Sequence, residues 1–447
     1  MIKLKFIHAA DIHLGSLLHL STTADDGLKK KFKEAIYNSF SKIVDLAIEN
    51  KVDFILLAGD IYDQEARSVK ANKFFNRECE RLNEFNIDVY MIAGNHDPLP
   101  DREAFDLPDN LYVFASDKVE EYRILSDNDQ VIARILGQSY ANQAESEEIY
   151  KDFIPQDNSS FNIGILHTQL DPYNNSYVPC RKDDLIKQQG IDYWALGHIH
   201  QFRIVNQNSP CIIYPGIPQG RDFGEQSLGG AVLVEVDHQN SIDYKLIPTA
   251  NFIWKRIEVK IDDGIEGPIE NLDDLKTLIF NQAAKLIKGD LIDSEDLESV
   301  NDNYSNQSVA YIVQWLIVGR GTLSNILTQQ KEEIIEELLI ELRAELSKSH
   351  PVIWSDSIRI RTSPPLPDFE YLEKNDDFFA DIGEVIREIE DKEDIQNELI
   401  AEIGNIWTID NMSNDPEKFS LDQDDFKAIL EGARNLIVEE VLKRRGD

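Results

Sequence analysis

The chain has 447 residues, 42% of them hydrophobic, which is enough for about three folding units with ordinary apolar cores and excludes a disordered or fibrous chain. It carries 82 acidic and 45 basic side chains, a formal net charge of −37, which argues against bulk electrostatic binding to polyanions. Three widely spaced cysteines form neither a disulfide framework nor a CxxC metal knuckle, and the N-terminal segment lacks the apolar core of a signal peptide. We therefore expect a cytoplasmic protein with no membrane association.

Residues 1–250 alternate apolar, β-branched runs with amphipathic stretches, the pattern of an α/β domain with central strands. Between the first two runs, apolar residues recur at helical spacing over residues 28–47, which predicts a helix packed on the sheet. The predicted strands span residues 4–9, 54–58, 89–93, 132–136, 162–166, 193–196 and 231–236.

After Pro248 the pattern predicts a compact α+β unit, with strands at 253–261, 310–318 and 352–361 and helices at 273–287 and 323–346. A polar stretch at 293–308 is expected to be a loop inside this unit. Three prolines at 364, 365 and 367 end it, and beyond them two apolar stripes, in 378–389 and 426–441, predict amphipathic helices that need a partner surface. The predicted domains are therefore 1–250, 251–365 and 366–447.

Five short segments concentrate carboxylate, amide and imidazole side chains and hold five of the nine histidines. They span residues 11–13, 59–63, 94–97, 166–168 and 197–200. Most follow an apolar run directly, so we expect them at the carboxyl ends of strands, where open α/β sheets build their sites. Asp11 and His13 alternate along a strand end, as do His198 and His200, so each pair can project to one side.

This combination of side chains suits a dinuclear metal site that hydrolyses phosphate esters, because two cations neutralise the ester's charge and supply hydroxide. Asp60 is the natural bridge between them. A mixed set of carboxylate, amide and imidazole ligands without thiolate suits manganese, iron or zinc better than calcium, and we prefer manganese. Each fragment alone has an ordinary explanation, such as a turn or a hydrogen-bonded core histidine, but all five together favour the site. The four histidines outside the pattern are expected to be structural, with His8 either packed in the core or hydrogen-bonded behind the metal ligands.

The ordered set of segments resembles the calcineurin-like metallophosphoesterase superfamily, whose fold is two mixed sheets sandwiched between helices with two metals at the strand ends. The resemblance implies a first metal on Asp11, His13, Asp60 and His200, and a second on Asp60, Asn95, His167 and His198. His96 is then the acid that protonates the leaving oxygen or stabilises its developing charge, with the adjacent Asp97 as the second catalytic residue, orienting the imidazole.

A finer resemblance is carried by residues 6–15, 193–200, 214–225 and 229–236. These are similar to the DNA repair exonuclease branch, the SbcD-like nuclease subunits that act with an SMC-like ABC ATPase. The resemblance implies 3′–5′ exonuclease action on duplex ends and endonuclease action on single strands. It also implies a small capping domain, a helical region that grips the coiled coil of the ATPase, a homodimer through the nuclease domain, and nucleoid association in a bacterial host.

Two positions leave the nuclease interpretation open. Asp63 stands where some relatives carry His, and Arg221 suits a DNA phosphate contact and a structural contact equally well. The alternatives are a small-molecule or phospholipid phosphoesterase of the same superfamily and a DNA-tethering scaffold with a vestigial nuclease.

Overall fold

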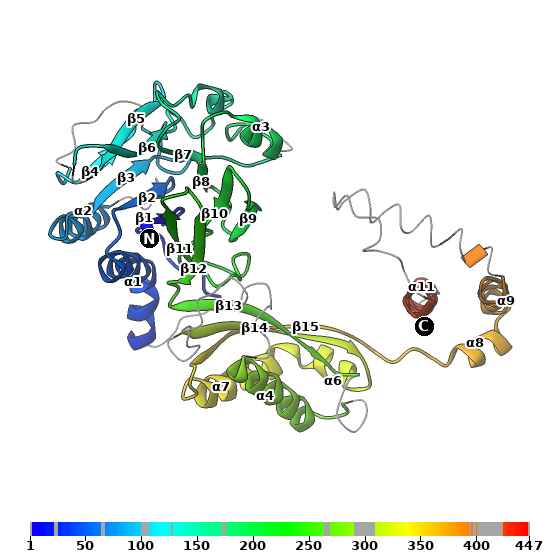
Figure 1. The fold of residues 1–447 in the computed structure, drawn as a ribbon. Helices are drawn as coiled ribbons and strands as arrows, with labels where there is room; N and C mark the ends of the chain where they lie inside the picture. Colours follow the sequence, from blue (N-terminus) through cyan, green and yellow to red (C-terminus); the bar gives the residue numbers. More distant parts are fainter. Residues whose placement is uncertain are drawn as a thin grey trace. The chain divides into compact units, whose positions relative to one another are not determined.

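The computed structural model describes residues 2–21, 26–63, 68–99, 107–126, 128–171, 176–262, 269–289, 309–392, 395–396, 399 and 423–445. Within these ranges the first part of the chain forms two six-stranded sheets, and a three-stranded sheet follows (Figure 1).

The first sheet has the strand order β12-β11-β1-β2-β3-β4. Strands β1 to β4 are parallel, whereas β11 pairs antiparallel with β1 and β12 pairs antiparallel with β11. The bounds are β1 Ile2–Ala9, β2 Phe54–Ala58, β3 Asp88–Ile92, β4 Leu111–Val113, β11 Gly230–Asp237 and β12 Ile242–Pro248. The carboxyl ends of β1, β2 and β3 therefore meet at one edge.

The second sheet has the order β5-β6-β7-β8-β10-β9, with four parallel strands in the middle and the antiparallel strands β5 and β9 at its margins. The bounds are β5 Glu120–Leu125, β6 Val131–Gly137, β7 Phe161–His167, β8 Tyr193–Gly197, β9 Arg203–Asn206 and β10 Cys211–Tyr214. Both sheets are thus mixed, as expected.

Side-chain alternation along the strands creates separate cores on the two faces of each sheet. Ile7 and Ile55 pack with helices α1 (Asp26–Asn50) and α2 (Val69–Asn83). Their neighbours Phe6 and Leu56 point the other way and pack with Ile163 and other residues of the second sheet. The outer face of the second sheet packs with α3 (Lys182–Lys187) and the short 3₁₀ helix η1 (Ile149–Asp152). The predicted α/β sandwich of two mixed sheets flanked by helices is confirmed.

The third sheet has the order β13-β14-β15, with bounds Phe252–Lys260, Ala310–Arg320 and Ile353–Ser363. In the chain, helix α4 (Leu272–Lys288) lies between β13 and β14, and helices α6 (Leu323–Gln329) and α7 (Lys331–Leu346) lie between β14 and β15. The single helix predicted over 323–346 is wrong, because Gln330 leaves helical geometry with φ −117° and ψ 31° and so separates α6 from α7. The loop predicted at 293–308 lies outside the described residues.

The chain divides into two compact units. The first comprises Met1–Val259, Lys276–Ile317 and Glu332–Ile360, and the second comprises Lys260–Leu275, Val318–Lys331 and Arg361–Asp447. The second unit contains α8 (Phe369–Asn375), α9 (Asp377–Asp391) and α11 (Gln423–Arg445). The three-domain division at residues 250 and 365 stays a prediction. No described helix is both long and apolar enough to cross a membrane.

Candidate metal centre

The five predicted segments meet where strands of the two large sheets end. Asp11 and His13 follow β1, Asp60 follows β2, and Asn95 follows β3, all in the first sheet. His167 is the last residue of β7, and His198 and His200 follow β8, both in the second sheet. Backbone hydrogen bonds tie adjacent segments together: the Asp11 N–H donates to the Gly59 carbonyl at 3.0 Å, and the His13 N–H to the Asp60 carbonyl at 3.0 Å.

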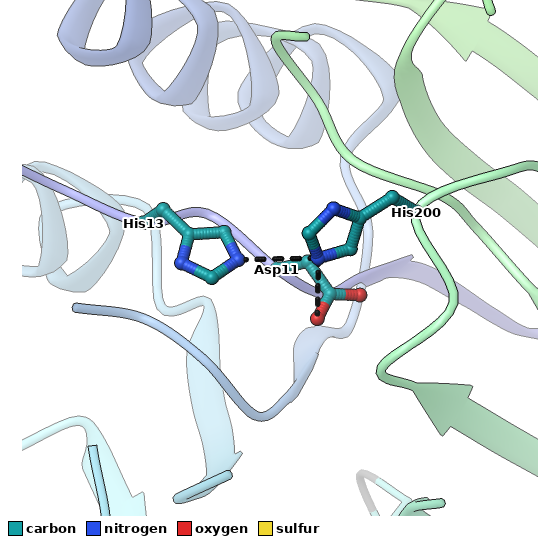
Figure 2. Close-up of side chains that lie close together, drawn as sticks. All are labelled: Asp11, His13 and His200. Atoms are coloured by element: carbon teal, nitrogen blue, oxygen red, sulfur yellow. Dashed lines mark hydrogen bonds and ion pairs between the residues drawn. The ribbon is translucent and has the colours of Figure 1, made fainter. Parts of the chain in front are cut away.

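Asp11, His13 and His200 form a first group of candidate ligands (Figure 2). The two imidazoles face each other, with 3.3 Å between the His13 Nε2 and the His200 Nε2. The His200 Nε2 lies 3.8 Å from the Asp11 Oδ1. Asp11 and His13 are completely buried. Two ring nitrogens and one carboxylate oxygen therefore converge on a small volume, as the ligands of a cation do.

Asp60, His167 and His198 form a second group, which Asn95 completes. The Asn95 Oδ1 lies 3.0 Å from both the His167 Nε2 and the His198 Nδ1. The Asp60 Oδ2 lies 3.3 Å from the His167 Nε2. The structure thus brings together all seven residues predicted as metal ligands, with Asp60 grouped with His167 and His198. That they bind two metals stays a prediction.

Asp60 interacts with side chains of both groups. Burial acts to raise its pKa, but the nearby imidazoles of His167 and His13 and the hydrogen bonds it accepts hold the pKa below its usual range. The carboxylate therefore stays ionised, and its electrostatic interactions extend to a histidine of each group, as a bridging ligand requires.

The donor set also fits divalent cations electrostatically. Burial acts to lower the pKa of His167, but the carboxylates of Asp60 and Asp11 outweigh it and raise this pKa to about 9. Burial and the charge of His167 lower the pKa of His198 to about 3. The carboxylates of Asp60 and Asp11 thus favour positive charge near His167, and the centre offers carboxylate, amide and imidazole donors, a set that suits manganese, iron or zinc.

Four residues of this centre have an unusual backbone conformation. Asp11, His13, Asp60 and His198 have φ values of 53°, 50°, 53° and 97°, in the left-handed region that residues with a side chain rarely adopt. Such strain persists only where surrounding structure imposes it, and it is common at functional sites. Gly94 is needed for close approach, because a Cβ there would collide with the Asp60 carboxylate.

His96 belongs to neither of these two groups, but with His13 and Asp63 it forms a third cluster of side chains that could hold a cation. Its Nδ1 is 3.0 Å from the Asp63 Oδ1, and its side chain is 48% exposed. The hydrogen bond to Asp63 raises the pKa of His96, which favours the protonated imidazole. Asp63 also accepts from the His13 Nδ1 at 2.7 Å.

Asp97 does not fill the orienting role expected for it. One carboxylate oxygen accepts the N–H groups of Ile61 at 2.8 Å and Tyr62 at 3.1 Å, and the other accepts that of Gly94 at 2.8 Å. Asp97 therefore fixes the backbone around Asp60 and Asn95, while Asp63 is the carboxylate that contacts the His96 ring. Burial and the neighbouring Asp60 raise the pKa of Asp97 to about 6.

Two further residues that the sequence left open have defined contacts. His8 is packed in the core as predicted, with its Nδ1 3.0 Å from the Tyr193 hydroxyl and its Nε2 3.1 Å from the Leu196 carbonyl. Arg221 makes the structural contact of the two considered, because its guanidinium pairs with Asp63 at 3.2 Å and Glu225 at 3.0 Å. Glu225 itself was not among the predicted site residues.

Comparisons with known proteins agree with this geometry. The family model described as calcineurin-like phosphoesterase matches residues 4–202. The protein named uncharacterized metallophosphoesterase YhaO, from Bacillus subtilis (strain 168), is 35% identical over 288 residues, which cover 64% of this chain and 69% of that protein. The chain belongs to the calcineurin-like phosphoesterase family. It is therefore a metal-dependent phosphoesterase, of a family that binds two divalent metals.

Relatives with more specific names are also similar. A DNA double-strand break repair protein Mre11 from Methanocaldococcus jannaschii is 30% identical over 291 residues, covering 63% of this chain and 73% of that protein. A dimetal phosphatase from Danio rerio is 12% identical, with a TM-score of 0.32 over 53% of this chain and 94% of that chain, a likeness too small to support an argument.

Proposed function

We propose that this calcineurin-like phosphoesterase is a manganese-dependent DNA nuclease that removes nucleotides from duplex ends in the 3′–5′ direction and cuts single strands internally. The observation that carries the proposal is the pair of adjacent ligand groups with an exposed histidine, His96, at their side. The similarity to proteins named for DNA double-strand break repair supports DNA as the substrate.

In this proposal Asp11, His13, Asp60 and His200 hold one cation and Asp60, Asn95, His167 and His198 hold the other. When bound, two such cations neutralise phosphate charge and lower the pKa of water enough to supply hydroxide near neutral pH. The chain's own residues fix the geometry: buried carboxylates and imidazoles are held on strained backbone at the sheet edges, so little rearrangement is needed before reaction.

His96 is proposed to donate a proton to the departing sugar oxygen. The hydrogen bond from its Nδ1 to Asp63 leaves Nε2 as the free donor, and the exposed ring can reach a substrate. Because Asp63 raises the pKa of His96, the imidazole stays protonated, and so able to donate a proton, at a higher pH than a free histidine would.

The net charge of −37 requires that contact with DNA be local or supplied by a partner. Helices α9 and α11 of the second unit offer a surface for such a partner, which we propose to be the coiled coil of an SMC-like ATPase. Val385 on α9 is 54% exposed, and Leu436 and Ile437 on α11 are 66% and 40% exposed. A homodimer through the nuclease domain would be a separate contact, and the place of action is then the cytoplasm or nucleoid.

The partner surface can be tested in the full chain by Leu436→Glu and Val385→Glu. Burying a leucine of this exposure contributes about 1–2 kcal/mol, so its loss should weaken the complex about 5- to 30-fold. We expect co-purification with the SMC-like ATPase to be lost while manganese-dependent cutting of single strands is unchanged. Glu440→Gln, on an exposed position of α11, is the matched control. Undiminished ATPase binding by both variants would remove these helices from the interface.

The competing function is a small-molecule or phospholipid phosphoesterase with the same metals. The test is a substrate panel: purified protein with manganese is given end-labelled duplex, single-stranded DNA, nucleotides, a phospholipid and a phosphodiester dye. The proposal predicts ladders of shortened duplex and internal cuts in single strands, with catalytic efficiency on DNA far above that on the small substrates. Efficient hydrolysis of a nucleotide or lipid with intact DNA would favour the competing function, and DNA binding without cleavage would favour a scaffold.

A further inference from the structure

In each of the two histidines of the first ligand group, a carboxylate contacts the ring nitrogen that faces away from the candidate metal position. The His13 Nδ1 is 2.7 Å from the Asp63 Oδ1, and the His200 Nδ1 is 2.7 Å from the Glu225 Oε1. Each Nδ1–H therefore donates away from the site, and each Nε2 carries its lone pair into the site. The 3.3 Å between the two Nε2 atoms follows from this arrangement.

The histidines of the second group are held differently. The His167 Nδ1 faces the Ala58 backbone carbonyl at 2.9 Å. His198 presents its Nδ1, not its Nε2, to Asn95, and its ring lies 4.7 Å from that of Tyr177, measured between centroids. The two candidate metal positions thus differ in what orients their imidazoles: charged side chains for the first, backbone and an aromatic ring for the second.

Arg221 joins the two carboxylates of the first position. Its guanidinium lies 3.2 Å from the Asp63 Oδ2 and 3.0 Å from the Glu225 Oε1, and its backbone N–H donates to the Glu225 Oε2 at 2.6 Å. All three side chains are less than 20% exposed. An Arg–carboxylate pair screened from water keeps a fixed geometry, so this network sets where both rings point.

The loop that carries Arg221 and Glu225 is fastened to β13. The Trp254 Nε1–H donates to the Gly220 carbonyl at 2.8 Å, and the Arg256 N–H donates to the Gln226 Oε1 at 2.9 Å. Phe223 packs edge-on against Trp254 with 4.8 Å between ring centroids. The loop is therefore braced at both ends of the Arg221–Glu225 segment, so two side chains on an irregular segment can keep a candidate metal ligand, His200, in place.

We propose that Asp63, Arg221 and Glu225 are positioning residues on which the first metal position depends and the second does not. The inference rests on the dinuclear site of the proposed function and extends it. Carboxylates behind ligating imidazoles fix their tautomer and orientation, and losing one typically lowers metal affinity 10–100-fold. That loss should fall on the ion at Asp11, His13 and His200 only.

The test counts manganese bound per chain after equilibrium dialysis at a free concentration that just saturates the natural protein. Glu225→Ala and Asp63→Ala should each retain one ion in place of two, with the affinity for the other reduced 10–100-fold. Glu225→Gln keeps an acceptor oxygen for His200 but loses the charge that faces Arg221. Its affinity for the first manganese ion should therefore lie between those of the natural protein and Glu225→Ala. Asp222→Asn, a half-exposed carboxylate on the same loop, is the matched control and should bind two. Circular dichroism verifies that each variant is folded.

A second readout verifies that the pair has been reduced to a single ion. Paired manganese ions give an exchange-coupled electron paramagnetic resonance signal, and Glu225→Ala should convert it to that of isolated manganese. Two ions at unchanged affinity in both alanine variants, or the loss of both ions together, would overturn the inference. If the natural protein bound two ions but left DNA intact, the proposed function would be wrong. Failure of the proposed function is therefore distinguishable from failure of the inference about positioning residues.

Discussion

Replacing Asp60 by alanine is expected to remove both metals at once and to abolish phosphodiester hydrolysis. The carboxylate is 1% exposed, lies 3.3 Å from the His167 Nε2 through its Oδ2, and accepts the His96 N–H at 2.8 Å through its Oδ1. It is the ligand proposed to be shared, so its loss takes negative charge from both positions. Elemental analysis of the purified variant should find no bound manganese pair.

Asp243→Ala is the control for that experiment, because it removes an exposed carboxylate on β12. It should keep both metals and full activity. Two ions per chain in Asp60→Ala would contradict the bridging assignment, and a single tightly held ion would mean that Asp60 serves only the group containing His167 and His198.

His96→Asn is expected to lower turnover about 10²–10⁴-fold while leaving metal content and DNA binding close to those of the natural protein. The reason is the position of the ring: it contacts Asp63 at 3.0 Å, it is half-exposed, and it belongs to neither of the two groups that contain the seven expected ligands. Turnover and bound manganese should be measured on the same preparation. The turnover of His96→Leu, whose side chain cannot donate a hydrogen bond, should fall at least as far as that of His96→Asn.

The control for His96 is His19→Asn, since His19 is 68% exposed and lies outside the ligand groups. A fall in metal content that parallels the fall in turnover would make His96 a ligand. Unchanged turnover in both His96 variants would remove it from catalysis altogether.

The central strands could be predicted from the sequence because they are buried on both faces and so appear as continuous apolar runs. β2 is buried at every position, and its predicted and observed bounds coincide. The marginal strand β5, with sequence EEYRIL and no fully buried residue, has no such run and was missed. Helix α2 was also missed, although its buried Ala71, Phe75, Cys79 and Leu82 recur at helical spacing among charged neighbours.

The site residues that directly follow a predicted strand could be predicted from the sequence. Asp11, Asp60 and His198 each follow a strand that the sequence reveals, so their convergence could be expected. Asp63 and Glu225 were not assigned roles because their partners depend on how distant segments fold together: Arg221 and Asp63 are 158 positions apart. Asp97 was predicted to orient His96 because it is the next residue in the sequence. The structure shows that Asp63 contacts the ring, a contact that depends on how separate segments fold together.

The most direct test of the two-metal account is anomalous scattering at the manganese edge from crystals of the full chain grown with manganese. The account predicts two peaks sharing Asp60: one among Asp11, His13 and His200, and one among Asn95, His167 and His198. A single peak, or manganese at neither group, would contradict it.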